Sequence, residues 1–398
     1  MTVCPTFDEF AGLAGQGNVI PVHATLLADG LTPVSAYHRL RERLPAFLFE
    51  SIVGGEHIAR FSFLGSGPRE VIEAFPEVTR TTPRGGAVVQ QATPPDPLSV
   101  LEARMAGLRP VEVPGLPPFV GGAVGFLGYE YVHCVEPTVP MAAEDVLGMP
   151  LMYFALMDTV VAFDHVRQQV WVIVNAHLDD APDLPTAYQA AVASVEQTVA
   201  ELSQAHVPQA VLSGAVDAPE PPPGNFTREA FEAAVERSKA YIRSGDVIQV
   251  VGSQRFERAF DASPLDLYRA LRLGNPSPYM FILETEQFAA VGASPEVHVR
   301  STHGAVEIRP IAGTRPRGRD RAEDERLEAD LLADPKERAE HLMLVDLARN
   351  DIGRVCDIGS VAVADYAIVE RYSHVMHIVS QVEGRLSEGK NAYDLMRA

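Results

Sequence analysis

The sequence predicts antiparallel β-strands mixed with α-helices. One hairpin pattern is the pair of strand-like runs 153–163 and 170–175, which flank a charged turn. A second is the pair 297–300 and 305–311, which flank a turn that contains Gly304. Stretches with apolar residues at helical spacing lie between these hairpins, so helices and strands alternate along the chain.

Three helices are predicted from their capping residues and apolar spacing. The run 185–202 has a proline in its first turn, and the run 227–244 has Thr227 as N-cap and Gly245 just past its end. A third helix begins at Asp334, which is followed by proline, and extends over 334–349. The short apolar run 247–251 is predicted to be a buried strand.

The composition is that of a large, acidic, folded protein. Of its 398 residues 46% are apolar, and 33 basic against 53 acidic side chains give a net charge of −20. The charge argues against nucleic acid or an anionic membrane as a partner. The length suggests two structural units, and we expect regions 1–205 and 225–398 joined by a proline-rich linker at 206–224. We find no internal repeat.

The cysteines and the N-terminus predict a cytoplasmic protein. Cys4, Cys134 and Cys356 lie far apart, which indicates free thiols in a reducing compartment. No basic residue precedes Arg39, so the basic start of a secretory signal is missing. No uncharged apolar run approaches the roughly 18 to 20 residues that cross a bilayer, and no membrane association is expected.

Two motifs are ambiguous when taken alone. The glycine-rich stretch 121–128 lacks the phosphate-binding patterns, so we interpret it as close backbone packing in a sheet. The stretch 311–318 ends a strand in a turn whose backbone N–H groups, with Arg315 and Arg317, can hold a carboxylate. Alternatively, these arginines neutralise the acidic run 323–325.

The helix that begins at Asp334 and two nearby histidines carry further candidates. Because its middle is apolar nearly all round, we expect this helix to be buried and Glu340 to enter the interior or a cleft. Glu340 beside His341 is either a buried ion pair or a ligand that suits Mg²⁺. His374 and His377 would share a face of a helix but point to opposite faces of a strand.

Together, these segments resemble component I of anthranilate synthase, within the chorismate-utilising enzymes. The resemblance extends from about residue 20 to the end of the chain and is most specific in the second half. The matching stretches are Phe47-Leu-Phe-Glu-Ser51, Phe119-Val-Gly-Gly-Ala-Val-Gly-Phe-Leu-Gly-Tyr129, Gly245-Asp-Val-Ile-Gln-Val-Val251, Asn275-Pro-Ser-Pro-Tyr-Met280, Gly292-Ala-Ser-Pro-Glu296, Arg309–Gly318, Asp334–Asn350 and Val369–Ser380.

The resemblance implies an α+β fold, in which large antiparallel β-sheets pack face to face as a sandwich with helices on the outside. It also implies conversion of chorismate and ammonia to anthranilate and pyruvate with Mg²⁺, the first step of tryptophan biosynthesis. A glutamine amidotransferase, component II, is the expected source of ammonia in a hetero-oligomer, and L-tryptophan is the expected feedback inhibitor. Residues 1–205 would then be the tryptophan-binding region and 225–398 the chorismate-binding catalytic region.

The resemblance also assigns roles to individual residues. Glu340 is expected to ligate the Mg²⁺ that holds the substrate carboxylate, while Gly313 and Thr314 contact chorismate. Glu296 is the expected general acid for the departing hydroxyl, because hydroxide leaves poorly without protonation and a partly desolvated carboxyl has a raised pKa. His377 is expected to assist pyruvate elimination, with His374 as second choice.

A tryptophan site is expected at Ser51 together with Pro278, Tyr279 and Met280. In this chain Phe49 stands where the family has a leucine. Inhibition is expected with a coupling on the order of 1–3 kcal/mol between the two sites.

Two relatives within the family are disfavoured by missing lysines. Aminodeoxychorismate synthases carry a lysine where this chain has Ala312, and isochorismate or salicylate synthases carry one where it has Gln249. Family members also continue past the point that matches Ala398, so we expect the catalytic region to be incomplete. The alternatives are therefore aminodeoxychorismate synthase component I and a non-catalytic module that binds tryptophan or a partner.

Overall fold

The computed structural model describes residues 1–52, 60–141, 145–206, 220–372 and 374–398. The chain divides into two units, one formed by Met1–Val207 with Pro264–Ala398 and the other by Pro208–Ser263. Most of the predicted linker 206–224 lies outside the described residues. The functional division into 1–205 and 225–398 stays a prediction.

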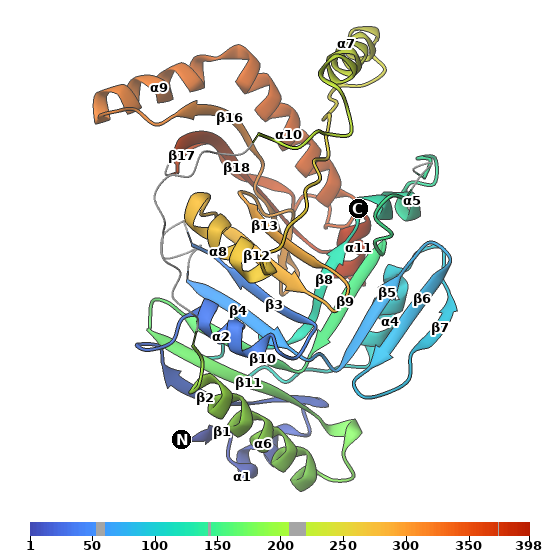
Figure 1. Cartoon of the computed structure of the whole chain (residues 1–398), viewed down its shortest axis with the longest axis vertical. Coiled ribbons are helices and arrows are strands. Elements are labelled where there is room, and N and C mark those ends of the chain that lie inside the picture. Colours follow the sequence, from blue (N-terminus) through green and yellow to red (C-terminus); the bar gives the residue numbers. More distant parts are fainter. Residues whose placement is uncertain (53–59, 142–144, 207–219, 373) are drawn as a thin grey trace. The chain divides into compact units, whose positions relative to one another are not determined.

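The strands and helices of the first unit follow one another along the chain in Figure 1. Its strands are β1 (Val3–Cys4), β2 (Val19–Leu27), β3 (Ala46–Glu50), β4 (Phe61–Ser66), β5 (Glu70–Ala74), β6 (Val78–Pro83), β7 (Val89–Ala92), β8 (Gly122–Leu127), β9 (Met152–Met157), β10 (Thr159–Asp164), β11 (Gln169–His177), β12 (Tyr279–Glu284), β13 (Ala289–Ser294), β14 (Arg300–Thr302), β15 (Ala305–Ile308), β16 (Ile311–Pro316), β17 (Ala362–Arg371) and β18 (Val375–Arg385). Its α-helices are α1 (Phe7–Leu13), α2 (Pro33–Leu40), α4 (Leu98–Ala106), α5 (Val132–Val135), α6 (Leu184–Leu202), α8 (Pro264–Gly274), α9 (Arg321–Ala333), α10 (Pro335–Gly353) and α11 (Ala392–Arg397). Two short 3₁₀ helices, η1 (Tyr129–Tyr131) and η2 (Leu178–Asp180), complete the first unit, and the second contains α7 (Arg228–Ser244).

The largest sheet has the strand order β1-β2-β11-β10-β4-β3-β12-β13. It contains strands from both predicted regions, because β12 and β13 pair beside β3. A large apolar core joins one of its faces to α1, α2, α6 and α8. Burial of this face follows the side-chain alternation of the strands, since successive residues point to opposite sides of a sheet.

The opposite face of the large sheet packs on a second sheet, of order β7-β6-β5-β9-β8. Their shared core contains Phe47 and Leu283 from the first sheet with Val124 and Tyr153 from the second. These two antiparallel sheets lie face to face with helices outside, so the predicted α+β sandwich is confirmed.

The predicted strand 153–163 is two strands. Asp158 separates β9 from β10, which belong to different sheets, so the chain passes from the second sheet into the first at this residue. The predicted hairpin with 170–175 is confirmed for β10, which pairs with β11 from Thr159 opposite Val174 to Asp164 opposite Gln169.

The glycine-rich stretch forms β8, which confirms that its backbone packs closely in a sheet. A Cβ atom on Gly125 would lie 1.8 Å from the carbonyl oxygen of Tyr153 on the neighbouring strand. A side chain at this position would force β8 away from β9.

A third sheet is built around β18. Strands β15 and β16 pair one after the other along one edge of β18, and β17 pairs along its other edge. The hairpin predicted at 297–311 is present as β14 and β15, with a tighter turn at His303 and Gly304, whose φ angles are both positive. Helices α9 and α10 pack against this sheet through small apolar cores.

The predicted helix boundaries agree with the structure at their capped ends. Asp183 caps α6, Thr227 caps α7, and Asp334 accepts two backbone N–H groups at the start of α10. Gly245 ends α7 in the left-handed conformation, with φ of 83°. Capping side chains are short-range signals, which explains why these ends were predictable.

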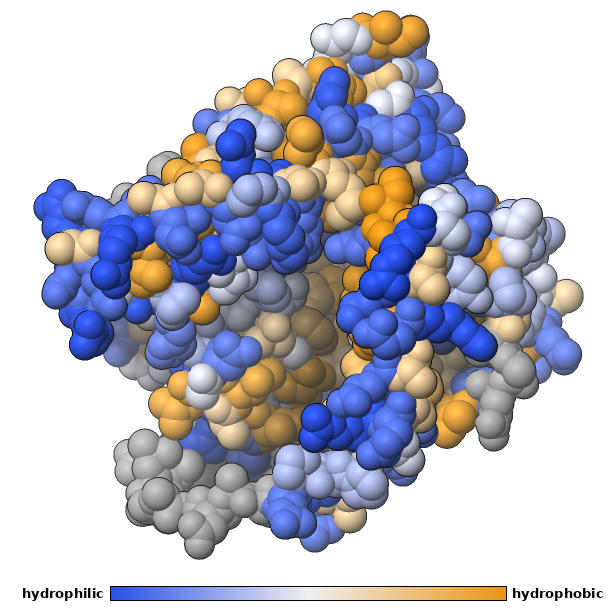
Figure 2. Space-filling model, turned by 90° about the horizontal axis from the view of Figure 1, so that it is seen from above, coloured by the Kyte–Doolittle hydropathy of each residue, from blue (hydrophilic) through white to orange (hydrophobic). Residues whose placement is uncertain are grey.

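Two predictions about burial are wrong. Residues 247–251 form no strand, and Ile248 and Val251 are 79% and 83% exposed, because within the described part of the second unit no strand pairs with this run. Helix α10 is not buried all round, because it contacts the third sheet on one side and leaves Leu342 and Leu347 about half exposed. Figure 2 shows apolar patches interspersed with hydrophilic residues on one face of the molecule.

The expectation of no internal repeat is also wrong. Helix α2 and strand β3 are repeated by helix α8 and strand β12. Four residues recur in the two helices at the same relative positions. Pro33, Tyr37, Leu40 and Arg41 of the first correspond to Pro264, Tyr268, Leu271 and Arg272 of the second. Each strand then ends in a glutamate, Glu50 or Glu284.

The two repeats are related by an approximate twofold axis within the first sheet. Strands β3 and β12 pair antiparallel, with Leu48 opposite Ile282 at the centre and Glu50 opposite Met280 at one end. Exchanging the repeats maps this pairing onto itself. The repeat therefore places similar residues at both ends of the strand pair.

Each repeat supplies donors to the glutamate of the other. The Tyr37 hydroxyl donates to Glu284 at 3.1 Å, and the Arg41 guanidinium pairs with the same carboxylate. Reciprocally, Tyr268 donates to Glu50 at 2.5 Å and the Arg272 Nε donates at 3.0 Å. Both glutamates are buried, so these donors replace the water that the carboxylates lose.

Among the helices that the structure describes, none combines the length and the apolar character needed to cross a membrane.

Candidate active site

A β-bulge at Gly313 shapes the centre of the candidate site. The pairing of β16 with β18 shifts register between Ala312 and Thr314, and Gly313 has φ of 69°. A Cβ atom here would lie 3.2 Å from the Glu337 Oε2 of α10. Both the backbone conformation and the available space therefore require glycine.

The bulge brings Gly313 and Thr314 to His377. The Nδ1 atom of His377 lies 3.0 Å from the carbonyl oxygen of Gly313 and 3.1 Å from the hydroxyl oxygen of Thr314. Because a carbonyl only accepts, Nδ1 carries the proton and donates it to Gly313. In the neutral ring this leaves Nε2 with a free lone pair, as a general base needs.

Tyr372 packs beside His377, with ring centroids 5.6 Å apart in an edge-on arrangement. Its hydroxyl donates to Glu370 at 2.9 Å, and Glu370 also pairs with Arg309. Burial, with the charge of Glu370, raises the pKa of Tyr372. Tyr372 therefore stays a neutral hydrogen-bond donor near the histidine.

Glu296 lies where β13 leads toward the third sheet. Its Oε1 accepts the backbone N–H of Ile311, the first residue of β16, at 3.2 Å. Glu296 is an exposed residue, but partial burial of its carboxyl raises the pKa, and the Ile311 N–H opposes this shift. The raised pKa favours the protonated form that a general acid requires.

The raised pKa of Glu296 gives a prediction for Glu296→Gln. The folded protein binds this proton more tightly than the unfolded chain, so Glu296 adds stability below its unfolded pKa and loses it as the pH rises through its folded pKa. The glutamine variant should therefore gain stability relative to the parent as the pH rises from about 4 to about 8. Urea unfolding across this range measures the difference. A difference that does not change with pH would contradict the shift.

Glu340 lies on a partly exposed side of α10, with its side chain 32% exposed, rather than in the interior that the sequence suggested. The Lys336 ammonium lies 2.8 Å from its Oε2 and 3.2 Å from the Oε1 of Glu337. Lys336 and Glu337 were missed by sequence reasoning, although Glu337 precedes Glu340 by three residues and so shares its helix face. His341 instead is buried and bonds to Ser380 at 2.6 Å.

The arginines after the bulge are both neutralised by carboxylates, but only Arg317 pairs within the acidic run 323–325, as one of the two sequence interpretations had it. Arg315 pairs with Asp330 at 2.7 Å and Asp334 at 2.8 Å, and Arg317 pairs with Asp324 at 2.7 Å. Arg317 lowers the pKa of Asp324 to about 2. These pairs fix α9 and α10 beside β16.

His374 and His377 have different surroundings. His374 lies just before β18, and its backbone carbonyl accepts the N–H of Arg317 at 3.1 Å. The contacts with Gly313 and Thr314 are made by His377. The geometry thus favours His377 as the base.

The residues of the expected tryptophan site gather at one end of the β3–β12 pair. Ser51 follows β3, and Pro278 precedes the paired residues Tyr279 and Met280. The Ser51 hydroxyl is buried without a hydrogen-bond partner among the described residues. Such a group indicates a missing ligand or water, because buried polar atoms are normally satisfied.

These residues lie a short way from Glu296. Tyr279 pairs with Ser294, the last residue of β13. The Ser294 hydroxyl then donates to the backbone carbonyl of Glu296 at 2.9 Å. Strand pairing thus connects the expected tryptophan site with the expected general acid.

The acidic side chains near Glu340 are the candidates for a metal site. Within the described ranges, no group of three or more His, Cys, Asp or Glu side chains is placed to hold a metal ion. Mg²⁺ needs fewer protein ligands, since one or two carboxylates with substrate oxygens and water complete its octahedron. Glu340 and Glu337 with a cation between them fit this requirement.

Comparison with known proteins identifies the family of this chain. A family model described as chorismate binding enzyme matches residues 44–398. Component 1 of anthranilate synthase from Pseudomonas aeruginosa is 44% identical over 395 residues, which cover 98% of this chain and 79% of that protein. The Acetivibrio thermocellus protein of the same name is 41% identical over 396 residues, with the same coverage of both chains.

Solved structures give the same result. The crystal structure of anthranilate synthase component I from Streptococcus pneumoniae matches with a TM-score of 0.70 and 33% identity, over 94% of this chain and 78% of that one. The menaquinone-specific isochorismate synthase of Escherichia coli, at 12% identity and a TM-score of 0.58 over 96% of this chain and 74% of that one, shares the fold.

The fold and the matched residues define a chorismate-binding enzyme. Within that class, the chain belongs to the family of component 1 of anthranilate synthase, a chorismate-utilising lyase.

Proposed function

We propose that this protein converts chorismate and ammonia to anthranilate and pyruvate with Mg²⁺. The observation that carries the proposal is the cluster in which the Gly313 bulge fixes the tautomer of His377 beside Thr314. The names of its relatives supply the reaction class, and the cluster supplies a base for it. This chain has Ala312 where a lysine nucleophile would stand, and the absence of that lysine favours ammonia as the nucleophile.

Glu296 and His377 act at different steps of the proposed reaction. Glu296, whose pKa is raised by partial burial, gives a proton to the hydroxyl that leaves the ring as ammonia adds. The Nε2 atom of His377 then removes the ring proton as pyruvate is eliminated. Thr314 and the Gly313 bulge contact the substrate beside these groups and hold it in place.

Glu340 and Glu337 would hold the metal ion. When bound, Mg²⁺ supplies the positive charge that holds the carboxylate of the substrate. The Lys336 ammonium contacts both glutamates, which supports a cation at this position. Glu340 is the proposed ligand, and Glu337 lies beside it on the same helix face.

The test is anthranilate fluorescence in a mixture of protein, chorismate, ammonium and Mg²⁺. Glu340→Gln should raise the Mg²⁺ concentration needed for half-maximal rate by about 10- to 100-fold, because a neutral amide is a weaker ligand than a carboxylate. Glu42→Gln is the control, because it makes the same substitution at an exposed glutamate. An unchanged Mg²⁺ requirement in Glu340→Gln would remove the assignment, and an amine product other than anthranilate would favour aminodeoxychorismate synthase.

L-Tryptophan is the proposed inhibitor, bound at Ser51, Pro278, Tyr279 and Met280. The unpartnered Ser51 hydroxyl supports this site, since an amino-acid ligand would satisfy it. We expect Ser51→Ala to weaken inhibition by about tenfold, the cost of one hydrogen bond. Inhibition curves with and without the substitution measure this change. Equal curves would reject Ser51 as a contact.

A glutamine amidotransferase, component II, is the proposed source of ammonia, in a hetero-oligomer. The printed name "component 1" of the relatives supports a second component. Glutamine-dependent activity that appears only on adding this partner would test the assembly.

A further inference from the structure

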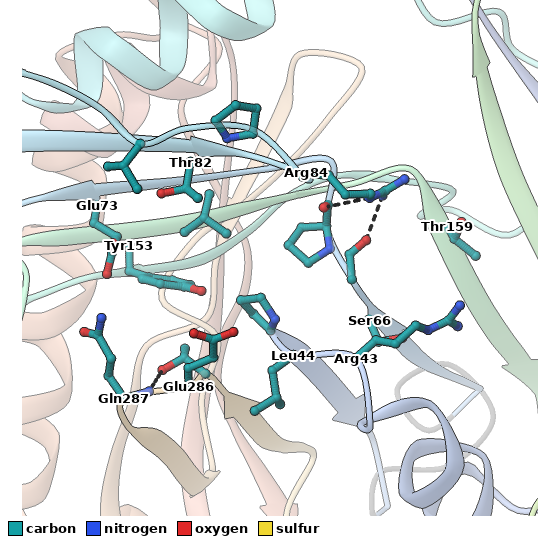
Figure 3. A pocket seen from close by; sticks show the side chains of 18 of the residues that line it. Arg43, Leu44, Ser66, Glu73, Thr82, Arg84, Tyr153, Thr159, Glu286 and Gln287 are labelled. Carbon is teal, nitrogen blue, oxygen red and sulfur yellow. Dashed lines mark hydrogen bonds between the residues drawn. The ribbon is translucent and has the colours of Figure 1, made fainter.

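A cavity of about 780 Å³ opens between the first two sheets, at the end of the β3–β12 pair opposite to Ser51. Its walls come from the turn between β12 and β13, the segment before β3, strands β5, β6 and β9, and α6. Figure 3 shows its side chains pointing inward from both sheets. The catalytic cluster does not contribute to it.

The cavity has a buried polar group with no partner. Tyr153 is 2% exposed, and its hydroxyl has no hydrogen-bond partner among the residues that the structure describes. In Figure 3 this hydroxyl points into the cavity. A buried phenol normally finds a partner, so this one is available to a ligand.

Two carboxylates lie at one end of the cavity and two arginines at the other, while a third arginine, Arg80, lies opposite Glu73 on the neighbouring strand. The carboxylates of Glu73 and Glu286 lie close enough to Tyr153 to raise the pKa of its hydroxyl, after burial as the main cause. At the other end are Arg84 and Arg43 (Figure 3), of which Arg43 pairs with Glu201 at 2.7 Å. Arg84 uses its Nε and Nη2 groups on the carbonyls of Pro68 and Gly67, and Nη2 also lies 3.3 Å from the Asp158 carboxylate. Its Nη1 group is left for a ligand.

The approximate twofold axis relates this cavity to the other end of the strand pair. Exchange of the repeats carries Tyr279 to Pro45 and Ser51 to Thr285. Both Pro45 and Thr285 line the cavity. The fold therefore places an equivalent hollow at each end of one strand pair.

We propose that this cavity binds a small free amino acid as a zwitterion. Its ammonium group would lie between Glu73, Glu286 and the Tyr153 hydroxyl, and its carboxylate would accept from Arg84. Separated opposite charges favour a zwitterion over a simple anion or cation, because each end of the ligand meets the opposite charge. The size of the cavity suits a small molecule. This site does not depend on the proposed reaction.

The test is calorimetric titration of the whole protein with each standard L-amino acid and, separately, with inorganic phosphate. The Ser51→Ala background removes a contact of the proposed tryptophan site. In that background at least one amino acid should bind. The double substitution Tyr153→Phe and Glu73→Gln should weaken this binding by about 10- to 100-fold, because the ligand loses charge-assisted hydrogen bonds.

Glu286→Gln is a second variant, because Glu286 is exposed and its loss should not disturb folding. It too should weaken binding. Binding that disappears with Ser51→Ala and ignores Tyr153, Glu73 and Glu286 would overturn the proposal. So would phosphate binding without amino-acid binding, or no binding of any amino acid. None of these outcomes alters the test for anthranilate formation.

Discussion

Glu284→Ala should lower the free energy of unfolding by about 3–5 kcal/mol, because it removes one partner of a buried charged group. The Glu284 side chain is 8% exposed and Arg41 is 19% exposed, so water cannot readily replace the lost carboxylate. The Tyr37 hydroxyl, whose pKa burial and Glu284 together raise, would also lose its acceptor. Urea unfolding of both proteins measures the difference.

Glu42→Ala is the matched control for this change. Glu42 also pairs with an arginine, Arg39, at 2.7 Å, but its side chain is 67% exposed. Exposed pairs contribute at most about 1 kcal/mol, so this variant should unfold almost as the parent does. Equal losses in the two variants would show that the carboxylate of Glu284 is not needed by its buried donors.

His377→Ala should lower the rate constant for anthranilate formation by about 10²- to 10⁴-fold, the usual contribution of a positioned general base. Its Nε2 is free because Nδ1 is committed to Gly313. The Michaelis constant for chorismate should change much less, since the base acts on the ring proton after binding. Steady-state fluorescence assays over a range of chorismate concentrations separate the two effects.

His374→Ala provides the control, because it is the same substitution three residues earlier. His374 contributes a backbone carbonyl to Arg317, which the substitution keeps. The variant should therefore stay close to the parent in rate. A large loss in His374→Ala with little loss in His377→Ala would reverse the two assignments.

Local signals made the helix ends predictable. The capping side chains of Asp183, Thr227 and Asp334 act within a few residues, so the sequence alone carries the information. The break at Asp158 carries a weaker signal, because only Asp158 and Thr159 interrupt the apolar residues of β9 and β10. The change of sheet there depends on partners that lie far away in sequence.

The candidate site needed the resemblance. Thr314 and His377 are 63 residues apart, and only the pairing of β16 with β18 brings them together. Glu296 was assigned a raised pKa on chemical grounds, and the structure gives the burial that causes it. The position of Lys336 between Glu337 and Glu340 could have been read from helical spacing, had the charged face of α10 been considered.

The internal repeat was hidden by a length difference. From Arg41 to Glu50 the chain advances by fewer residues than from Arg272 to Glu284, so a fixed spacing does not align the two segments. The shared Tyr and Arg positions become significant only when the structure shows that each pair contacts the glutamate of the other repeat.

This exchange of partners also affects how the chain folds as it is made. Glu284 lies 247 residues after the Tyr37 that donates to it, and Tyr268 lies 218 residues after Glu50. At about 5–20 residues per second, a ribosome takes on the order of 10–50 s to supply the second repeat after the first. During that interval β3 has no β12 beside it, and Glu50 has neither Tyr268 nor Arg272. The newly made N-terminal segment therefore leaves the ribosome with an open sheet edge, which is a stage at which chaperones can bind and at which self-association competes with folding.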